Sequence, residues 1–213
     1  MVTPQRGLVF HLTHIDNLAS IATTGLRCDS NVQSDDVGFV EVGHRSIKDR
    51  RSARQVPAPL GGVVADYVPF YFATRSPMLF ALHKNTVEGY DGGQTEVVYL
   101  VSSVETIAAQ RLPFIFTDRN ASLAFAKFSS EVSELDELVD WELMEARYFT
   151  NTNDEPDRRE RRMAELLVRG TVPFETLLGV ATFDEPMKQR VVEILTNVGL
   201  DDVQVHARPQ WYF

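Results

Sequence analysis

The chain has 213 residues, which is the usual length of one domain and enough to bury a substantial core. Hydrophobic residues make up 44% and charged residues 24%, a balance that excludes an intrinsically disordered chain. With 21 basic and 30 acidic residues the formal net charge is −9, which excludes a protein that coats duplex DNA through a basic surface but leaves room for a local basic groove.

The first quarter of the chain predicts a strand, a helix and a long loop. Residues 8–13 are apolar and rich in strand-forming residues. We expect a helix over residues 18–22, capped by Thr13 or Asp16 and ended by Gly25. Residues 29–43 are rich in Ser, Asn, Asp and Gly and predict a loop.

The middle of the chain begins with a basic segment, residues 44–54, and a cluster of helix breakers, residues 56–62. Residues 68–73 then predict a short buried strand. Ser76 and Pro77 are typical of the N-cap and first position of a helix. Further on, residues 96–101 and 114–116 predict strands, and residues 121–126 predict a helix.

The last third carries fewer clear signals. Residues 138–144 fit either a helix or an extended turn, and periodicity leaves both open. A charged run over residues 158–163 leads into a buried strand over 164–168. Residues 191–195 predict a helix and residues 203–206 a final strand. Together the elements predict an α+β fold in a single domain over residues 1–213.

Several classes of site are not indicated by the sequence. The single cysteine, Cys28, excludes a disulfide framework and a cysteine-rich zinc site, and favours a reducing, cytoplasmic setting. With no apolar run of about 20 residues, we expect neither a signal peptide nor a membrane span. His11 and His14 lack a third ligand nearby, so we expect no metal. Neither the G-x-G-x-x-G turn nor the G-x-x-x-x-G-K-[ST] loop is present.

Three residues on separate strands could carry chemistry: His11, Tyr71 and Glu165. Glu165 opens an apolar strand, so we expect it half buried and directed into a cleft. A carboxylate placed there is suited to stabilise positive charge that develops beside a sugar hydroxyl. The order His, Tyr, Glu is more specific than any of the three residues alone.

Each of these residues also has a purely structural interpretation. His11 fits a hydrogen-bonded core histidine, and Tyr71 fits a core aromatic. Glu165 fits a salt-bridge partner of Arg161 and Arg162. The run of residues 158–162, with four arginines, fits a solvated helix face.

The order His, Tyr, Glu resembles the arrangement of the ADP-ribosyltransferase fold, and three blocks resemble the DarT family. They are Phe-His-Leu-Thr-His-Ile-Asp-Asn-Leu at residues 10–18, Val-Pro-Phe-Tyr-Phe-Ala-Thr-Arg-Ser-Pro-Met-Leu at 68–79, and the pattern spread over 153–175. The resemblance implies an ADP-ribosyltransferase-like fold with a central split β-sheet flanked by helices.

The resemblance also implies a function. DarT enzymes are the DNA-modifying toxins of toxin–antitoxin systems, and they transfer ADP-ribose from NAD to a base in single-stranded DNA, with thymine the expected base and a sequence-dependent choice of site. The implied partners are NAD, single-stranded DNA and a macrodomain antitoxin of the DarG kind, with no metal and no membrane. Transfer to another DNA base, RNA or protein, a phosphate-removing transferase of the same fold, and a non-catalytic nucleic-acid-binding module remain alternatives.

The matching positions imply residue roles. Glu165 matches the catalytic glutamate and Arg51 the catalytic arginine, with Arg50 in its place if the register slips by one. The positions that match the NAD pocket are His11, Thr13, Tyr71 and Met78. The positions that we assign to the DNA substrate are Arg75, Asn120, Asp154 and Arg158.

The role of Arg51 stays open between two accounts. An arginine has a pKa above about 12 and is a poor base, so Arg51 could act by charge on the deprotonated acceptor. A buried and crowded Arg51 could instead take the proton itself.

Basic residues gather in 44–54 and 158–169, whereas 131–145 carry acidic residues without a Lys or Arg, so we expect an acidic body with a local basic cleft.

Overall fold

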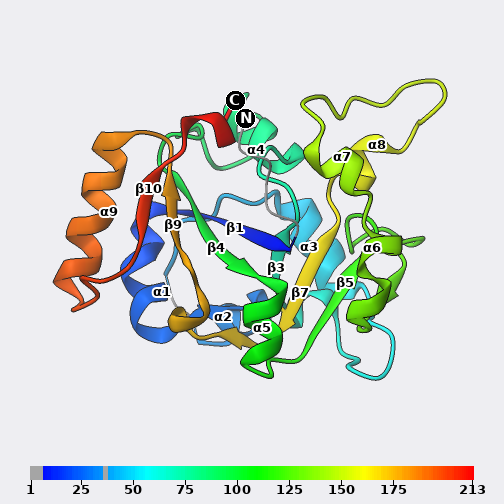
Figure 1. Cartoon of the computed structure of the whole chain (residues 1–213), viewed down its shortest axis with the longest axis horizontal. Helices are drawn as coiled ribbons and strands as arrows, with labels where there is room; N and C mark the ends of the chain where they lie inside the picture. Colours follow the sequence, from blue (N-terminus) through cyan, green and yellow to red (C-terminus); the bar gives the residue numbers. More distant parts are fainter. Residues whose placement is uncertain (1–6, 36–37) are drawn as a thin grey trace.

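A mostly antiparallel sheet of eight strands forms the centre of the molecule in the computed structural model, which describes residues 7–35 and 38–213 (Figure 1). The strand order is β10-β9-β4-β1-β3-β7-β5-β6, and β9 with β10 is the parallel pair. The strands are β1 (Leu8–His14), β3 (Tyr67–Tyr71), β4 (Val97–Ser103), β5 (Phe114–Thr117), β6 (Phe128–Ser129), β7 (Glu165–Arg169), β9 (Gly179–Thr182) and β10 (Val205–Ala207). A second small sheet pairs β2 (Leu26–Arg27) with β8 (Thr171–Val172).

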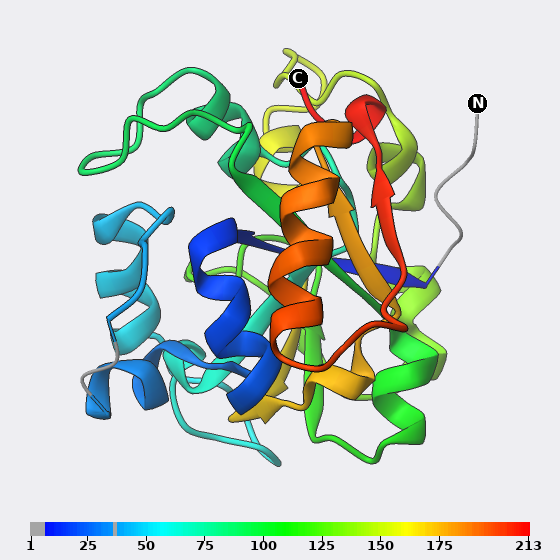
Figure 2. The same cartoon turned by 90° about the vertical axis from the view of Figure 1, so that its left-hand side faces the viewer.

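Helices cover both faces of this sheet, which confirms the expected α+β architecture. The α-helices are α1 (Leu18–Thr24), α2 (Asp29–Ser34), α3 (Arg45–Ala53), α4 (Pro77–His83), α5 (Val104–Ala109), α6 (Leu135–Leu138), α7 (Trp141–Glu145), α8 (Arg158–Arg161) and α9 (Glu185–Asn197). Short 3-10 helices are η1 (Ile15–Asn17), η2 (Val64–Asp66), η3 (Val132–Glu134), η4 (Phe174–Thr176) and η5 (Pro209–Trp211). Figure 2 shows α9 and α1 side by side in front of the strands.

The core divides according to the alternation of side chains along each strand. On one face, Val9 and Leu100 belong to a buried cluster with Leu18 of α1 and Val191 of α9. On the other face, Phe10 and Tyr99 belong to a cluster with Leu79 of α4 and the C-terminal Tyr212. The sheet is therefore buried on both sides, which fits its long apolar runs.

The sheet opens between β1 and β3. Strand β1 pairs with β4 along its whole length, but in the described residues it pairs with β3 only at Phe10–Tyr71. Strand β3 in turn pairs with β7 from Tyr67–Arg169 to Tyr71–Glu165. The two halves of the sheet thus separate beyond a single shared position, which confirms the expected split.

Local signals at two helices behave as the sequence predicts. The hydroxyl of Ser76 accepts a hydrogen bond from the Leu79 amide at 3.2 Å, so Ser76 is the N-cap of α4. Gly25 ends α1 with a φ of 83°. The predicted caps of α1 are wrong, because η1 intervenes between β1 and α1, and it is His14 Nδ1 that accepts from the Asp16 amide at 3.2 Å.

The expected loop over residues 29–43 is wrong in part, and the expected helix over residues 121–126 is wrong. Residues 29–34 form helix α2 rather than a loop, with Asp29 in its first turn, where a negative charge favours the helix dipole. Residues 121–126 form turns rather than a helix. The Asn120 side chain accepts from the Ser122 amide and Asp118 from the Lys127 amide, and such local bonds compete with a helix. Residues 36–37 of the expected loop, and the N-terminal residues 1–6, lie outside the described residues.

The segment that the sequence left undecided is helical at both of its ends. Helix α6 ends at Leu138, and α7 begins after Asp140, whose carboxylate accepts from the Leu143 amide at 3.0 Å.

Across residues 7–35 and 38–213, no helix has the length and apolarity that a bilayer crossing requires.

We expect Gly25→Ala to destabilise the fold by about 1–2 kcal/mol, because a side chain resists the left-handed conformation at this position. A Cβ there would also lie 2.8 Å from Thr171 Cγ2 and 3.0 Å from the Val172 carbonyl oxygen. Urea unfolding measures the change. Gly38→Ala is the control, since its Cβ would meet nothing within 4 Å. Equal unfolding midpoints for the two variants would contradict the prediction.

Candidate active site

A cavity of about 400 Å³ lies where the sheet opens. Strand β1 contributes His11, β3 contributes Tyr71, and β7 contributes Glu165. Helices α1 and α3 and residues 38–44 form much of the remaining lining. All the residues that the sequence analysis assigned to catalysis and to NAD line this one cavity: His11, Thr13, Arg51, Tyr71, Met78 and Glu165.

An ion pair lies at the inner end of the cavity. Arg51 Nη1 donates to Glu165 Oε2 at 2.8 Å, and the two residues are 5% and 1% exposed. Glu165 is therefore buried rather than half buried, because β7 lies between β3 and β5. The Glu165 amide donates to Thr117 Oγ1 at 3.2 Å, which ties the start of β7 to the end of β5. Arg50, the alternative to Arg51, is exposed.

The structural interpretation of Glu165 as a salt-bridge partner of Arg161 and Arg162 is wrong. Arg161 pairs with Asp140, Glu155 and Asp157. Arg162 is 3% exposed and donates from Nη1 to the carbonyls of Leu143, Met144 and Ala146. Burial lowers the pKa of Arg162 to about 10. Neither arginine is a partner of Glu165, so the carboxylate belongs to Arg51.

One atom of each residue in the ion pair has no hydrogen-bond partner among the described residues. Glu165 Oε1 and Arg51 Nη2 are both buried and accept or donate no hydrogen bond among the described residues. A buried polar atom without a partner costs about 1–3 kcal/mol, so such atoms are rare outside functional sites. The carboxylate oxygen can accept from a hydroxyl, and the guanidinium nitrogen can donate to an oxygen. The cavity therefore fits a ligand that presents both, such as a nucleotide with its ribose and phosphates.

Arg51 is held in its charged form. Burial opposes the charge of the guanidinium, but the attraction and hydrogen bond of Glu165, together with Asp29 and Tyr71, outweigh burial and raise the pKa of Arg51. In this geometry the Arg51 guanidinium keeps its proton. Because a group must lose its proton before it can act as a base, Arg51 is a poor proton acceptor here. Its chemistry is that of a fixed cation.

Tyr71 and Met78 form an uncharged wall beside the ion pair. Tyr71 and Glu165 are direct partners in the β3–β7 ladder, so their side chains leave the same face of the sheet. Burial, and then the nearby Glu165 charge, raise the pKa of Tyr71 and keep it neutral. Its hydroxyl donates to Met78 Sδ at 3.6 Å. A flat ring and a polarisable sulfur suit an aromatic ligand.

His11 spans the opening in the sheet. Its Nδ1 donates to the Pro69 carbonyl of β3 at 2.8 Å, which assigns the proton to Nδ1 and leaves Nε2 as an acceptor. Burial lowers the pKa of His11 to about 4, although the bond to Pro69 opposes this. The imidazole is therefore neutral near pH 7. His11 is hydrogen-bonded as its structural interpretation required, and it also lines the cavity.

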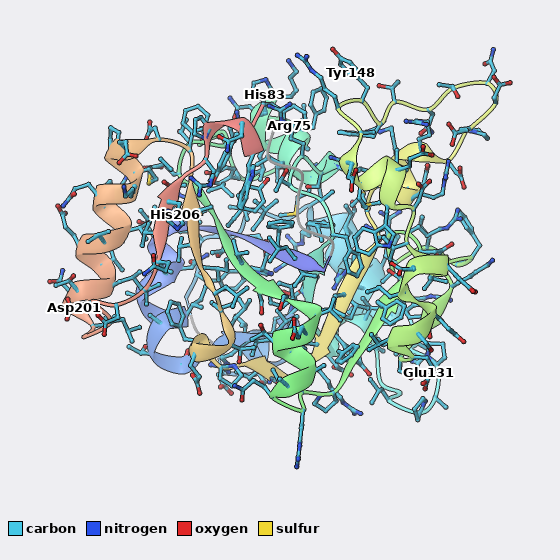
Figure 3. The ribbon with its side chains drawn as sticks, in the orientation of Figure 1. Arg75, His83, Glu131, Tyr148, Asp201 and His206 are labelled. Carbon is cyan, nitrogen blue, oxygen red and sulfur yellow. The ribbon has the colours of Figure 1, made fainter. Side chains whose placement is uncertain are left out.

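The residues assigned to the DNA substrate are spread over a wider area. Asn120 lines the cavity and is 6% exposed. Arg75 donates from Nε to the Tyr212 carbonyl at 2.8 Å and lies over the Phe213 ring, at the end of the molecule where Figure 3 labels it beside His83. Arg158 pairs with Glu155, and Asp154 is exposed. Neither Arg75, Arg158 nor Asp154 lines the cavity.

Three contributors to the cavity were not among the site residues predicted from the sequence. Residues 38–43 were expected within a loop and His44 within the basic segment, although Gly38 and Gly43 enclose the mostly apolar residues 39–42, which could have marked them. Lys48 of α3 pairs with Asp29 at 3.0 Å and with Glu41, and these carboxylates outweigh burial and raise its pKa. Arg159 also lines the cavity. Among the residues with described side chains, no group of three His, Cys, Asp or Glu could hold a metal ion.

Comparison with known proteins gives consistent matches over almost the whole chain. Residues 10–213 match the family model described as "ssDNA thymidine ADP-ribosyltransferase, DarT". A DNA ADP-ribosyl transferase from Thermus sp. (strain 2.9) is 37% identical over 211 residues, which cover 99% of this chain and 98% of that protein. A DNA ADP-ribosyl transferase–DNA ADP-ribosyl glycohydrolase fusion protein from Thermosipho africanus is 22% identical over 96% of this chain and 49% of its own length.

Two solved structures share the fold. Thermus sp. 2.9 DarT in complex with ADP-ribosylated ssDNA superposes with a TM-score of 0.89 at 34% identity, covering 100% of this chain and 99% of that chain. The same protein in complex with NAD+ gives a TM-score of 0.83 at 35% identity, covering 100% of both chains.

We expect the free energy of unfolding to fall as the pH is lowered from about 6.5 to about 4. Over this range the unfolded chain binds a proton at His11 that the folded chain excludes, so this part of the stability is present at higher pH and lost on acidification. Urea midpoints measured in pH steps should fall less steeply for His11→Gln. The exposed His206 gives a matched variant, His206→Gln, which should follow the wild type. Parallel curves for wild type and His11→Gln would refute the assignment.

Proposed function

The chain belongs to the DarT family, and on that basis we propose that it is an enzyme that transfers ADP-ribose from NAD to thymine in single-stranded DNA. The observation that carries the proposal is the match, over the whole chain, to a DarT in complex with ADP-ribosylated ssDNA. The cavity supports it, because the residues expected for catalysis and NAD binding converge on it. We treat residues 1–213 as one catalytic domain.

The cavity fits NAD through complementary groups. His11 Nε2 is a neutral acceptor for a ribose hydroxyl, and the Thr13 side chain adds a hydroxyl on the same strand. Tyr71 and Met78 supply the wall against which the nicotinamide ring packs. The buried, unpaired Glu165 Oε1 and Arg51 Nη2 supply an acceptor and a donor at the end of the cavity.

Glu165 is the catalytic carboxylate in this proposal. NAD, when bound, supplies an ADP-ribosyl group whose ribose carbon becomes electron-poor as neutral nicotinamide leaves. Glu165 Oε1 accepts from the 2′-hydroxyl of that ribose, and its negative charge lies where positive charge develops. The bond to Arg51 fixes the carboxylate before the reaction, so no reorganisation is needed.

Arg51 acts in this proposal as a cation rather than as a base. The raised pKa of its paired guanidinium favours this account over proton abstraction. A cation beside the acceptor stabilises a thymine that has lost its ring N–H proton, and water can carry that proton away. The same charge attracts the phosphates of the nucleotide.

We assign Asn120 to the acceptor side of the cavity, since it is the proposed DNA residue that lines it. Arg75, Asp154 and Arg158 remain predictions for nucleotides on either side of the acceptor base. Single-stranded DNA is bound through phosphates and stacked bases, which suits sites at some distance from the reacting atoms.

A toxin of this kind requires a partner that neutralises it. We propose a macrodomain antitoxin that removes the DNA modification, and a cytoplasmic setting where DNA and NAD meet. The Thermosipho protein, whose name joins a DNA ADP-ribosyl transferase to a DNA ADP-ribosyl glycohydrolase, supports a partner of this class.

We expect Glu165→Gln to slow ADP-ribose transfer by about 10²–10³-fold or more, because the amide removes the charge that stabilises the developing cation. Mass spectrometry of a single-stranded oligonucleotide incubated with NAD measures the transfer. Glu131→Gln is the matched control, since Glu131 is exposed and outside the cavity (Figure 3). No mass shift in any of four oligonucleotides, each rich in a different base, would refute the proposed function, and a shift without thymine would change the acceptor.

We expect Arg51→Gln to reduce transfer by about 10²-fold and Arg50→Gln to leave it within about threefold. Arg51 is buried against Glu165, whereas Arg50 lies one residue away on the exposed side of α3. The same oligonucleotide assay compares them. A larger loss in the Arg50 variant would place the catalytic arginine at the other position.

A further inference from the structure

One wall of the cavity has little backbone support of its own. We call residues 38–44, all of which line the cavity, the roof segment. It is neither helix nor strand, and among the described residues no backbone–backbone hydrogen bond reaches 38–43. Something other than secondary structure must therefore set its position relative to β1.

The side chain of Asn17 makes two hydrogen bonds to the roof segment. Asn17 Nδ2 donates to the Val40 carbonyl at 2.9 Å, and Asn17 Oδ1 accepts from the Val40 amide at 2.8 Å. The amide side chain thus pairs with Val40 as a neighbouring strand would. Because Val40 needs one donor and one acceptor, the contact also fixes which way the Asn17 amide faces.

The Asn17 side-chain amide also determines how the Thr13 hydroxyl group is oriented. The second hydrogen of Asn17 Nδ2 is donated to Thr13 Oγ1 at 3.1 Å. Thr13 is 5% exposed and lines the cavity. Since its oxygen already accepts from Asn17, the hydroxyl hydrogen is left to donate elsewhere, toward an acceptor in the cavity. Asn17 therefore links the position of the roof segment to the orientation of the Thr13 hydroxyl.

The other contacts of the roof segment do not tie it to β1 by a hydrogen bond among the described residues. The His44 carbonyl accepts from the Ile47 and Lys48 amides of α3, and the Gly43 amide donates to Glu41 Oε1 within the segment. Val42 belongs to a buried apolar cluster, which holds the segment close without fixing its orientation. Lys48 pairs with Glu41 and lies 4.9 Å from the centre of the Phe39 ring, but Phe39 is exposed and the Glu41 side chain is 40% accessible. Ion pairs of this kind are weak and screened by salt.

We propose that Asn17 is a positioning residue for the nucleotide half of the site. It fixes the distance of the roof segment from β1 and orients the Thr13 hydroxyl as a donor to bound NAD. The proposal rests on the proposed function, because its effect is on NAD recognition. Asn17 lines the cavity, but its three side-chain hydrogen bonds are already used within the protein, so it acts through Thr13 and Val40.

The test compares Asn17→Ala, which removes all three bonds, with Asn17→Asp, which keeps an acceptor for the Val40 amide but has no donor. We expect both variants to raise KM for NAD about tenfold, with kcat at saturating NAD and Kd for DNA within about threefold of the wild type. Asn197→Asp, at an exposed position in α9, is the matched control and should leave KM unchanged.

A second measurement follows the Val40 amide directly. Hydrogen exchange in the protein without NAD should show a protected Val40 N–H in the wild type and in Asn17→Asp, and rapid exchange in Asn17→Ala. A raised KM together with a protected Val40 amide in Asn17→Asp would assign the effect to the donor bonds, to Thr13 Oγ1 and the Val40 carbonyl.

Unchanged KM for NAD in both Asn17 variants would overturn the inference. So would a fall in kcat and in thermal midpoint with KM unchanged, since that pattern indicates a structural role alone. If the wild-type protein fails to modify DNA, the proposed function fails, and calorimetric titration of NAD then decides the role of Asn17. A Kd raised about tenfold in both variants would support it, and an equal Kd would refute it.

Discussion

The cavity exists because strands β1 and β3 share a single paired position, Phe10–Tyr71. Beyond that position the backbone groups facing the opening need other partners, since a buried amide or carbonyl without one is costly. His11 supplies one of them by donating across the opening to the Pro69 carbonyl. The bond joins the two halves of the sheet and leaves Nε2 facing a ligand site, while burial lowers the pKa of His11 and keeps the imidazole neutral. One irregularity in strand pairing thus produces both the space and part of its chemistry.

The buried Arg51–Glu165 pair lies in the same opening and joins α3 to β7. Removing two charges from water is expensive, and their attraction compensates only when the remaining polar atoms are also satisfied. Here Glu165 Oε1 and Arg51 Nη2 are left without protein partners. This arrangement is poor for stability alone, but it suits a site in which a bound nucleotide completes the hydrogen bonds. The pair also fixes both charges before a ligand arrives.

The net charge of −9 and a nucleic-acid substrate are compatible because charges act locally. Much of the arginine-rich run before β7 is neutralised within the protein, since Arg158 and Arg161 pair with carboxylates. The cavity is lined by charges of both signs, with Arg27, Lys48, Arg51 and Arg159 against Asp16, Asp29, Glu41 and Glu165, so the expected excess of basic residues is not found in its lining. Attraction of a DNA strand there depends on single placed charges such as Arg51 rather than on a net positive field.

Local signals in the sequence were sufficient for the apolar strands, the Ser76 cap, the glycine that ends α1 and, by resemblance, the residues around one cavity. They were not sufficient for helix α2, for the turns over residues 121–126, or for the place of the roof segment in the cavity. In the turns and the roof segment, side-chain hydrogen bonds hold the backbone. The partner of Glu165 was also decided by the tertiary structure. Arg161 and Arg162 are near it in sequence, yet Arg51, 114 residues away, is the group that the fold brings into contact. Periodicity and capping report on neighbours along the chain, whereas an ion pair across an opened sheet depends on how strands and helices pack.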